Sequence, residues 1–442
     1  MSLNDAVNSV QDSVLSDLRR LITIESVSSQ PEHDDDVLAA ADLVSDLLRD
    51  AGCPDVRLLA AGGGKPAVYG HFPAPEGQPT VLLYAHYDVQ PQGDPEAWTS
   101  PAFSPTVRDG RLYARGSSDD KGGIAVHLGV LRAFAGNPPV GVKVFIEGEE
   151  EIGSPSMGAL LERYGQELAA DVFVIADAVN WKVGEPALTT TLRGVVDAVV
   201  TVSTLQTGLH SGQFGGVVPD ALTALSRLLA TLHDDRGNVA IEGLFSAPDP
   251  EVDYDLDRLR EETGLLEGVE WVGDGMASAR MWTRPAASVL AIDATPVRDA
   301  SNTLVPSARA KVSVRIAPGD TVENATAALR NHLLKHAPWG ARVEVEDGQG
   351  GAGTRIDLSS DRAKAALAAL AEGFGVTAVE VGVGGSIPIV AEFAELNPEA
   401  VFLLTAVVDP TSRMHGIDES LELEDLRKAM LSQALLLQRL AN

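Results

Sequence analysis

The sequence contains a single cysteine, Cys53, among 442 residues. An intrachain disulfide is therefore impossible, and a zinc site built from several cysteines is excluded. The sequence also lacks an apolar run of the roughly 20 residues that a membrane helix needs, and its N-terminus lacks a charged-then-apolar signal pattern. We therefore expect a cytoplasmic protein that has no membrane partner.

Basic residues are scarce as well. Lysine and arginine number 34 against 63 aspartates and glutamates, which gives a formal net charge of −29. Nucleic acids and anionic membranes repel such a surface, so neither is expected as a partner. Internal repeats and low-complexity tracts are absent from the sequence. Because 45% of the residues are hydrophobic, the chain can form a large core, and its length predicts two domains.

Short apolar strands alternate with helical patterns in the N-terminal part of the chain. Strands are expected at 80–89, 142–148 and 171–177, and helices at about 122–134 and 156–169. This βαβα rhythm predicts an α/β fold with a mainly parallel sheet covered by helices. The rhythm resumes near the C-terminus with "DRAKAALAALAEGFG", "EAVFLLTAVVD" and a helix over 419–440.

The region in between has a different pattern. "ALTTTLRGVVDAVVTVST", from residue 187, predicts one long alternating strand of a sheet that has one open face. A helix, two strands, a helix and a strand follow in a βαββαβ order, before the Gly-rich break "GQGGAGT" at 348–354. We therefore predict a discontinuous first domain, 1–188 and 351–442, and a second domain inserted at 189–350.

Histidines and acidic residues gather where strands end or helices begin. The positions are His86 and Asp88 in "YAHYDVQP", Asp119 and Asp120 in "RGSSDDKGG", Glu150 and Glu151 in "GEEEIGS", Asp177 in "IAD" and His415 in "RMHG". Ligands collect at such strand ends in open α/β sheets. Because His86 and Asp88 lie two residues apart on a strand, they point the same way, and Asp88 can hold the imidazole in one tautomer.

Taken singly, each position has an ordinary structural explanation. An aspartate before a helix commonly caps it, and Glu147 and Glu149 are expected to be solvated rim residues. Taken together, two histidines and several carboxylates suit divalent cations such as Zn²⁺, Mn²⁺ or Co²⁺. Converging carboxylates without a metal would raise one another's pKa values, and two bound cations would remove that problem.

In this order, "AHYDVQP", "RGSSDDKGG", "GEEEIGS", "IAD", "LHSGQFGG" and "RMHG" resemble the motifs of the co-catalytic di-zinc metallopeptidases and amidohydrolases. That family includes aminoacylase, glutamate carboxypeptidase, succinyl-diaminopimelate desuccinylase and carnosine dipeptidases, and the resemblance covers nearly the whole chain.

The resemblance implies an α/β zinc-peptidase-like catalytic domain that binds two divalent metal ions per subunit. Zinc is the expected metal, with manganese or cobalt as alternatives. The implied metal ligands are His86 and Asp177 for one ion, Glu151 and His415 for the other, and Asp119 as a bridge, next to a cis Asp119–Asp120 peptide. Asp177, in place of a glutamate, resembles the dipeptidase and aminopeptidase branch.

The resemblance also assigns further roles. Glu150 would be the general base, and Asp88 would support the site through His86. His210 would stabilise the oxyanion in the partner subunit's site, which implies a homodimer formed through the inserted lid and dimerisation domain. Arg315 would bind the C-terminal carboxylate of the substrate. The remaining implied substrate contacts are Thr303, Gly385 and Ser386.

These features predict a metal-dependent amide hydrolase, a dipeptidase acting on short peptides that have a free C-terminal carboxylate. Its mechanism would use a metal-bridging hydroxide and Glu150 as the base that relays the proton. An N-acyl amino acid deacylase or desuccinylase would share this mechanism. A non-catalytic, metal-stabilised dimer that binds peptides is an alternative of another class, although every ligand and the base are present. The acidic composition and the lack of a phosphate-cradling glycine loop disfavour a two-metal phosphoesterase.

Overall fold

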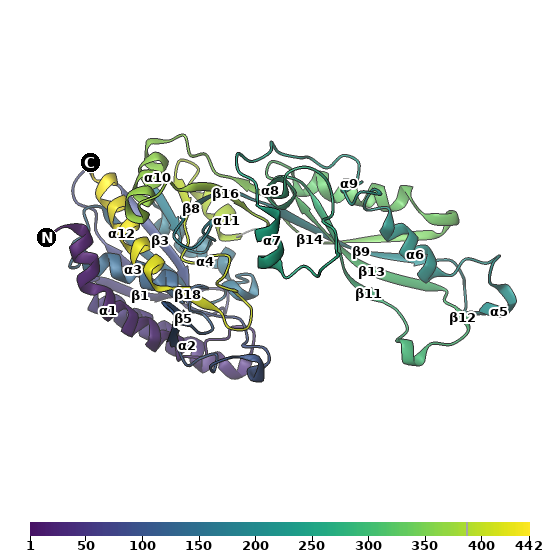
Figure 1. Ribbon diagram of the computed structural model, residues 1–442, viewed down its shortest axis with the longest axis horizontal. Coiled ribbons are helices and arrows are strands. Elements are labelled where there is room, and N and C mark those ends of the chain that lie inside the picture. Colours follow the sequence, from purple (N-terminus) through teal and green to yellow (C-terminus); the bar gives the residue numbers. More distant parts are fainter. Residues whose placement is uncertain (386–387) are drawn as a thin grey trace. The chain divides into compact units, whose positions relative to one another are not determined.

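A computed structural model describes residues 1–385 and 388–442, and the chain forms two compact units (Figure 1). The first unit comprises Met1–Thr190, Ile356–Val381 and Pro388–Asn442. The second unit comprises Thr191–Arg355 and Gly382–Ile387. The first unit therefore contains both ends of the chain and every position of the predicted metal site.

A large mixed sheet has the strand order β1-β2-β6-β3-β7-β17-β8-β15, with β16 beside β8, and its strands β1, β2, β3, β6, β7 and β17 lie wholly in the first unit. Its strands are β1 (Asp55–Leu59), β2 (Ala67–Phe72), β3 (Thr80–His86), β6 (Gly141–Glu147), β7 (Val172–Ile175), β8 (Ala187–Leu192), β15 (Thr354–Arg355), β16 (Val379–Val383) and β17 (Val401–Leu404). The central strands β6, β3, β7 and β17 run parallel. Near-continuous apolar sequences form them, as expected for strands buried on both faces.

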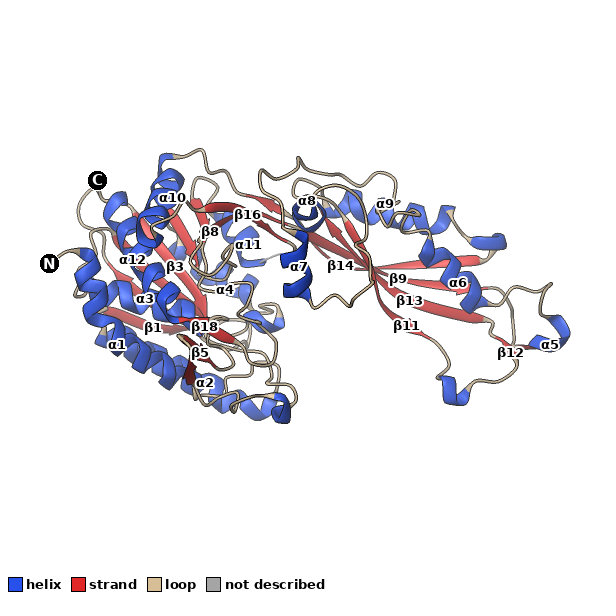
Figure 2. Cartoon of the chain, in the orientation of Figure 1, coloured by secondary structure: helices blue, strands red, loops and turns tan. Residues whose placement is uncertain are grey.

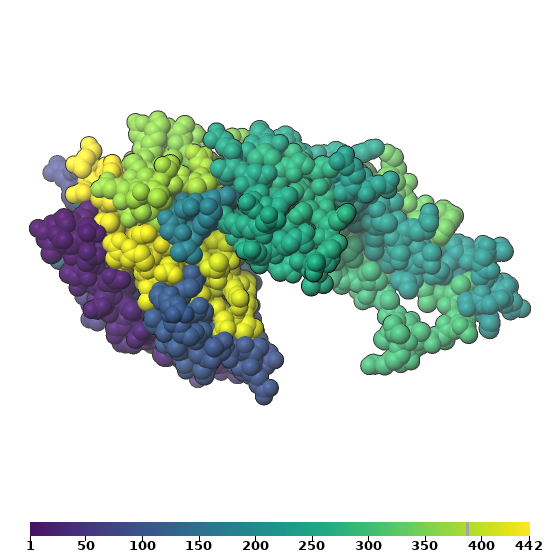
Figure 3. Space-filling view, viewed as in Figure 1, coloured from purple at the N-terminus to yellow at the C-terminus, as the bar shows by residue number. Residues whose placement is uncertain are grey.

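Helices cover both faces of this sheet (Figure 2). They are α1 (Leu3–Ile22), α2 (Asp34–Asp50), α3 (Lys121–Ala133), α4 (Met157–Leu168), α10 (Asp361–Phe374), α11 (Pro388–Leu396) and α12 (Leu423–Leu440). Helices α1, α2, α3, α10 and α12 share one apolar core with the sheet. On the opposite face, Phe393 of α11 packs against Phe145 and Phe173 of the strands. Helix α1 also packs against α12, so the purple N-terminal and yellow C-terminal segments lie side by side on the surface (Figure 3).

A small sheet with the order β18-β5-β4 accompanies the large one. Its strands are β4 (Thr106–Arg108), β5 (Arg111–Tyr113) and β18 (Ser420–Glu422). The predicted C-terminal helix over 419–440 therefore starts too early, because residues 420–422 pair with β5 and the helix begins at Leu423. This pairing brings the chain around Glu419 next to the chain around Arg115.

The second unit contains an antiparallel sheet with the order β11-β13-β9-β14. Its strands are β9 (Gly194–Ser203), β11 (Ala286–Asp293), β13 (Ser307–Ile316) and β14 (Arg342–Gly351). Along β9 and β13, buried residues alternate with more exposed ones, and the buried ones share a core with α6 (Ala221–Ala230) and α9 (Val322–Lys335). The second unit also contains the strands β10 (Leu209–His210) and β12 (Thr303–Leu304) and the α-helices α5 (Ser211–Phe214), α7 (Leu256–Thr263) and α8 (Ala277–Trp282).

Two sequence predictions about this region are wrong. The single strand predicted from residue 187 is two strands, β8 and β9, which are separated at Arg193. A Cβ on Gly194 would lie 2.4 Å from the carbonyl oxygen of Gly351, so only glycine allows this close approach of the two chains. The Gly-rich segment predicted as a break is partly strand, because β14 continues to Gly351 past an irregularity between Asp347 and Gly350.

Among the described residues, no helix combines the length and the apolar character that crossing a membrane requires.

Candidate metal centre

His86 is the last residue of β3, and its side chain is fully buried. Its Nδ1 lies 3.0 Å from the backbone oxygen of Asp88 and 3.5 Å from the carboxylate of Asp88. The backbone oxygen is therefore the nearer acceptor for Nδ1–H, and this contact leaves Nε2 free to bind a cation. Asp88 therefore contacts the ring as the sequence predicts, but its backbone oxygen lies nearer to Nδ1 than its carboxylate does.

The carboxylate of Asp88 has a different set of partners. It accepts hydrogen bonds from the backbone N–H groups of Glu150, at 3.3 Å, and Glu151, at 3.1 Å. These two glutamates begin the short 3₁₀ helix that follows β6, and the carboxylate of Asp88 lies at its start. Asp88 therefore fixes the direction in which both glutamates leave the strand.

Two groups of donor atoms lie at the carboxyl edge of the parallel strands. The first group contains His86, Glu150 and Asp177, and the second contains Asp119, Glu151 and His415. Within each group, one donor atom from every residue lies within 4.8 Å of the others. The structure thus brings together all five predicted ligands and the predicted base. They follow the strands β3, β6 and β7 or lie in the loop before α3, and His415 lies between Leu404, where the strand β17 (Val401–Leu404) ends, and Ser420.

Asp119 contacts both groups. Its Oδ1 lies 3.1 Å from Nε2 of His86, and its Oδ2 lies 2.9 Å from Nε2 of His415. Glu151 completes the second group, with Oε2 3.2 Å from the same nitrogen of His415. The Asp119–Asp120 peptide is cis. The helix cap is Asp120, whose carboxylate accepts the backbone N–H of Gly123, so Asp119 does not have this structural role.

The pKa values of the site reflect burial, hydrogen bonds and neighbouring charges. The pKa of Glu150 is raised to about 7: burial is the main cause, the charge of His86 opposes the shift, and the neighbouring carboxylates add to it. Burial likewise raises the pKa of Asp177 well above its ordinary value. Hydrogen bonds to Asp119 and Glu151 raise the pKa of His415 to about 10. Divalent cations would replace protons at these positions, and imidazole and carboxylate donors are the ligands that Zn²⁺, Mn²⁺ and Co²⁺ accept. The residues therefore fit such ions.

Two other glutamates of the acidic stretch are buried, so the prediction that they are solvated rim residues is wrong. Glu147 is 3% exposed and accepts a hydrogen bond from the Tyr84 hydroxyl at 2.8 Å. Burial raises the pKa of Glu147 to about 8, which favours its neutral form at pH 7. Glu149 is 5% exposed and accepts hydrogen bonds from the backbone N–H of Lys65 and the hydroxyl of Ser156. Of the four glutamates in this stretch, only Glu150 and Glu151 belong to the candidate metal centre.

Sequence reasoning missed several residues that support the site. Gln90 donates a hydrogen bond from Nε2 to Oε2 of Glu151 at 2.8 Å. Glu419 accepts the backbone N–H of Asp119 at 3.2 Å, and Arg115 forms a 2.7 Å ion pair with Glu419. Gln90 lies only four residues after His86 in the sequence, and this proximity could have marked it as a candidate site residue. No local pattern indicates Glu419, because its partners lie about 300 residues earlier in the chain.

The other predicted site residues belong to the second unit. His210 on β10 pairs with Thr303 on β12, and both residues are exposed. Arg315 lies on β13, and its charge adds to the effect of burial in lowering the pKa of Arg193 to about 10. Gly385 is half-buried, and apart from its chain neighbours no atom of the described residues lies within 4 Å of the position that a Cβ would take. Ser386 lies outside the described residues.

Arg193 is a further residue that the sequence analysis did not single out. It is 9% exposed, and its guanidinium donates to the backbone oxygens of Gly384, Arg280 and Arg284. Within the described part of the chain, neither Arg193 nor Arg315 forms an ion pair with a carboxylate. Among the residues that the structure describes, the second unit therefore holds two neighbouring cationic side chains that form no ion pair.

Parallel strands whose carboxyl ends present paired imidazole and carboxylate donors define an α/β metallohydrolase. The sequence matches the model of peptidase family M20/M25/M40 over residues 82–439. The chain therefore belongs to this family and is a metal-dependent peptidase. The resemblance found in the sequence is confirmed, as is the predicted α/β fold.

The chain is similar to several dipeptidases over almost its full length. A cysteinylglycine-S-conjugate dipeptidase of Corynebacterium striatum is 34% identical over 435 residues, which cover 96% of this chain and 94% of the relative. The solved structure of the dipeptidase Dug1p of Saccharomyces cerevisiae matches with a TM-score of 0.80 at 25% identity, covering 99% of this chain and 98% of that one. Human carnosine dipeptidase 1 has the same fold, with a TM-score of 0.81 at 24% identity over 99% of this chain and 98% of its own.

Proposed function

We propose that the protein is a dipeptidase that hydrolyses short peptides with a free C-terminal carboxylate. The observation that carries this proposal is the carboxylate of Asp119, which joins two groups of cation-binding donors beside Glu150. The dipeptidase activities named for the relatives in Corynebacterium striatum and Saccharomyces cerevisiae support dipeptides over N-acyl amino acids as substrates. They also count against a non-catalytic binding protein.

In this proposal each ligand keeps its predicted place. His86 and Asp177 hold one ion, Glu151 and His415 hold the other, and Asp119 bridges the two. Zinc is the proposed metal, and manganese and cobalt are the alternatives, because the same donors accept all three. When bound, such cations would lower the pKa of a coordinated water and polarise the scissile carbonyl.

Glu150 is the proposed general base. Its side chain is 22% exposed, and its Oε2 lies 4.0 Å from Nε2 of His86, so it borders the centre and still reaches solvent. A carboxylate in this position can accept a proton from a water at the centre and return it to a departing group. Glu150 takes the proton of the attacking water and delivers it to the leaving amine, which would otherwise depart as an unstable anion.

The second unit would supply substrate contacts, as the lid and dimerisation domain predicted at 189–350. Arg315 is proposed to bind the substrate carboxylate, and the unmatched positive charges of Arg315 and Arg193 support this role. Thr303, Gly385 and Ser386 remain proposed contacts. His210 is proposed to stabilise the oxyanion in the partner subunit of a homodimer, and its exposed position next to Thr303 is consistent with reaching another molecule. A cytoplasmic location is proposed from the composition.

The principal test is hydrolysis of a panel of dipeptides and N-acetyl amino acids. The purified protein is stripped of metal and reloaded with Zn²⁺, Mn²⁺ or Co²⁺, with Glu150→Gln as the matched control. We expect metal-dependent dipeptide turnover that falls by about 10²–10⁴-fold in the variant, while the variant keeps its metal. Turnover of the acetylated substrates alone would identify a deacylase. Binding of two metal equivalents without any turnover would favour a binding protein.

A mixing experiment tests the role of His210 across a dimer. Glu150→Gln lacks the base, and His210→Ala lacks the proposed oxyanion donor, so each homodimer should be inactive. A heterodimer of the two variants contains one site with both groups intact, provided that His210 acts in the partner's site. Recovery of activity on mixing and subunit exchange supports this arrangement, whereas no recovery in a proven heterodimer contradicts it.

A further inference from the structure

A buried carboxylate lies directly behind the loop that carries Asp119. Glu419 is fully buried. Its Oε1 accepts the backbone N–H groups of Ser118, at 3.0 Å, and Asp119, at 3.2 Å, together with the Ser118 hydroxyl at 3.0 Å. Its Oε2 accepts the backbone N–H of Gly116 at 3.1 Å and Nη1 of Arg115 at 2.7 Å. These five donors occupy the acceptor sites of the carboxylate, so Glu419 has none left for a metal ion.

Arg115 extends this contact to the second loop of the site. It is 2% exposed. Its Nη2 donates to the backbone oxygens of His415, at 3.2 Å, and Pro91, at 3.1 Å. His415 has a φ of 62°, a left-handed conformation that costs a non-glycine residue free energy and therefore needs support from its surroundings. The guanidinium of Arg115 supplies that support through its hydrogen bond to the backbone oxygen of His415.

One ion pair thus joins the backbones of two residues whose side chains lie 2.9 Å apart at the candidate metal centre. Glu419 holds Asp119 by its N–H, and Arg115 holds His415 by its C=O. A buried ion pair adds little net stability by itself, but this pair has a defined geometric effect. It fixes the distance between two predicted ligands that different parts of the chain contribute.

We propose that Glu419 and Arg115 are positioning residues that set the affinity and geometry of the cation group of Asp119, Glu151 and His415. The proposal rests on the metal-binding role proposed above for these three residues. The group of His86, Glu150 and Asp177 depends on the ion pair only through Asp119. Disturbing the ion pair should therefore weaken one of the two bound cations more than the other.

The test titrates metal-free protein with Co²⁺ and follows both the visible absorption and the number of metal equivalents bound. In Glu419→Gln, an amide –NH₂ replaces one acceptor oxygen and faces donors on either side of the carboxylate position. We expect the second equivalent to bind about 10–100-fold more weakly than in the wild type, with an altered Co²⁺ spectrum, while the first equivalent binds with a smaller change. Arg115→Lys keeps the charge but cannot reach Glu419 and His415 at once, so it should give the same pattern. If Glu419→Gln does not fold, the Arg115→Lys variant alone tests the proposal.

The matched control is Asp17→Asn. Asp17 is another largely buried carboxylate, paired with Arg132 at 2.6 Å between α1 and α3, and it touches none of the proposed ligands. The control should lose thermal stability but bind both Co²⁺ equivalents as the wild type does. Wild-type affinity and an unchanged spectrum at both equivalents in Glu419→Gln and Arg115→Lys would overturn the proposal. Failure of the wild type itself to bind two equivalents would instead overturn the proposed dinuclear site, so the two failures can be told apart.

Discussion

Oδ2 of Asp119 lies 2.9 Å from Nε2 of His415 in the first unit. The other oxygen of the same carboxylate lies 3.1 Å from Nε2 of His86. Asp119 therefore faces a donor of each candidate cation group, whereas His415 faces one group only. The two residues should consequently differ in the number of metal ions that depend on them.

Substitution of these two residues should separate their roles. We expect Asp119→Ala to retain fewer metal ions than His415→Ala, because the shared carboxylate serves both groups. After dialysis against a weak chelator, His415→Ala should keep about one equivalent and Asp119→Ala close to none, as measured by elemental analysis. The control His33→Ala changes a histidine that pairs with Asp36 away from the site, and it should keep the wild-type content. Two equivalents in Asp119→Ala would rule out a bridging carboxylate.

Much of the fold follows from hydrophobic periodicity, because local pattern and burial agree. The strands at 80–86 and 141–147 are almost continuously apolar and form the buried centre of the sheet. The errors come from contacts between distant segments. The division between β8 and β9 depends on the approach of Gly194 to Gly351, and the start of α12 depends on the pairing of β18 with β5. Neither contact leaves a periodic signal.

The candidate ligands could be predicted because each follows a strand or precedes a helix in a recognisable motif. Burial could not be predicted in the same way for the acidic stretch. Glu147 and Glu149 are the same residue type as Glu150 and Glu151, and only tertiary contacts with Tyr84, Lys65 and Ser156 distinguish them. Glu419 and Arg115 were missed for the same reason, since their function depends on which loops they join.

The proposed role of Arg315 predicts a specific dependence on the substrate carboxylate. Arg315→Ala should raise KM for dipeptides by roughly 10–100-fold, because a charge-assisted hydrogen-bonded pair contributes about 1.5–3 kcal/mol. The same substitution should have a much smaller effect on dipeptide amides, which lack that carboxylate. Arg315→Lys should recover only part of the affinity, since a lysine cannot form paired hydrogen bonds.

Lys311 provides the control on the same strand. It pairs with Asp197 at 2.9 Å, so Lys311→Ala removes a positive charge from β13 without removing the proposed contact. Steady-state kinetics should show nearly wild-type KM values for this variant. An equal effect of Arg315→Ala on free and amidated dipeptides would contradict carboxylate recognition.

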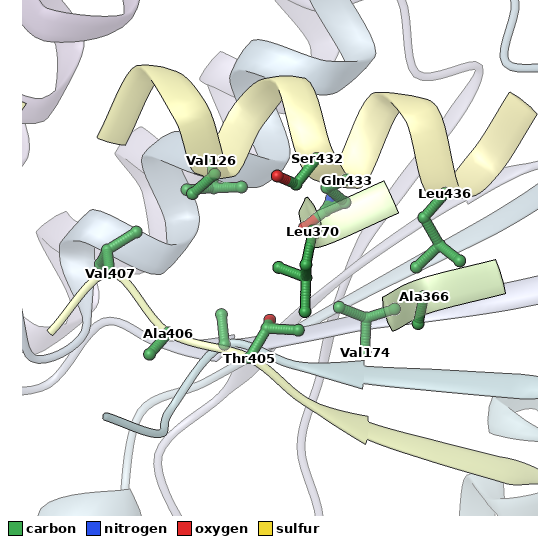
Figure 4. A pocket seen from close by; sticks show the side chains of 12 residues that line it. Val126, Val174, Ala366, Leu370, Thr405, Ala406, Val407, Ser432, Gln433 and Leu436 are labelled. Carbon is green, nitrogen blue, oxygen red and sulfur yellow. The ribbon is translucent and has the colours of Figure 1, made fainter. Parts of the chain in front are cut away.

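Because His127 is buried, we expect the free energy of unfolding to decrease at acidic pH. Its buried ring on α3 lies between the backbone oxygen of Tyr84 and the side-chain amide of Gln433, and burial lowers the pKa of His127 to about 4. Gln433 also lines a cavity of about 30 Å³ beneath α12, whose other walls are mainly aliphatic (Figure 4). A charged imidazole therefore has no compensating carboxylate among the residues around it that the structure describes.

The unfolded chain binds this proton with an ordinary pKa near 6.5, above the folded value. The contribution of His127 to stability is therefore complete above pH 6.5 and is lost as the pH falls toward 4. Between pH 7.5 and 4.5, the wild type should lose about 2–3 kcal/mol more than His127→Gln. Thermal or urea unfolding of both proteins across this range measures the difference. Parallel stability curves would show that His127 is not buried in its neutral form.

Helices α10 and α12 pack so closely at Gly373 that we expect an alanine there to destabilise the protein. A Cβ at this position would lie 2.1 Å from Oγ, 2.9 Å from N and 3.0 Å from Cα of Ser432, so backbone as well as side chain blocks it. Alanine normally stabilises a helix by about 1 kcal/mol relative to glycine, but the overlap should outweigh this gain and cost about 1–3 kcal/mol net. Gly158 on α4 is the matched control, because apart from its chain neighbours and the backbone of its own helix no described atom lies within 4 Å of its Cβ position. In urea unfolding, the midpoint of Gly158→Ala should be unchanged or higher than that of the wild type, and the midpoint of Gly373→Ala should be lower. Equal midpoints for the two variants would mean that α10 and α12 can move apart without cost.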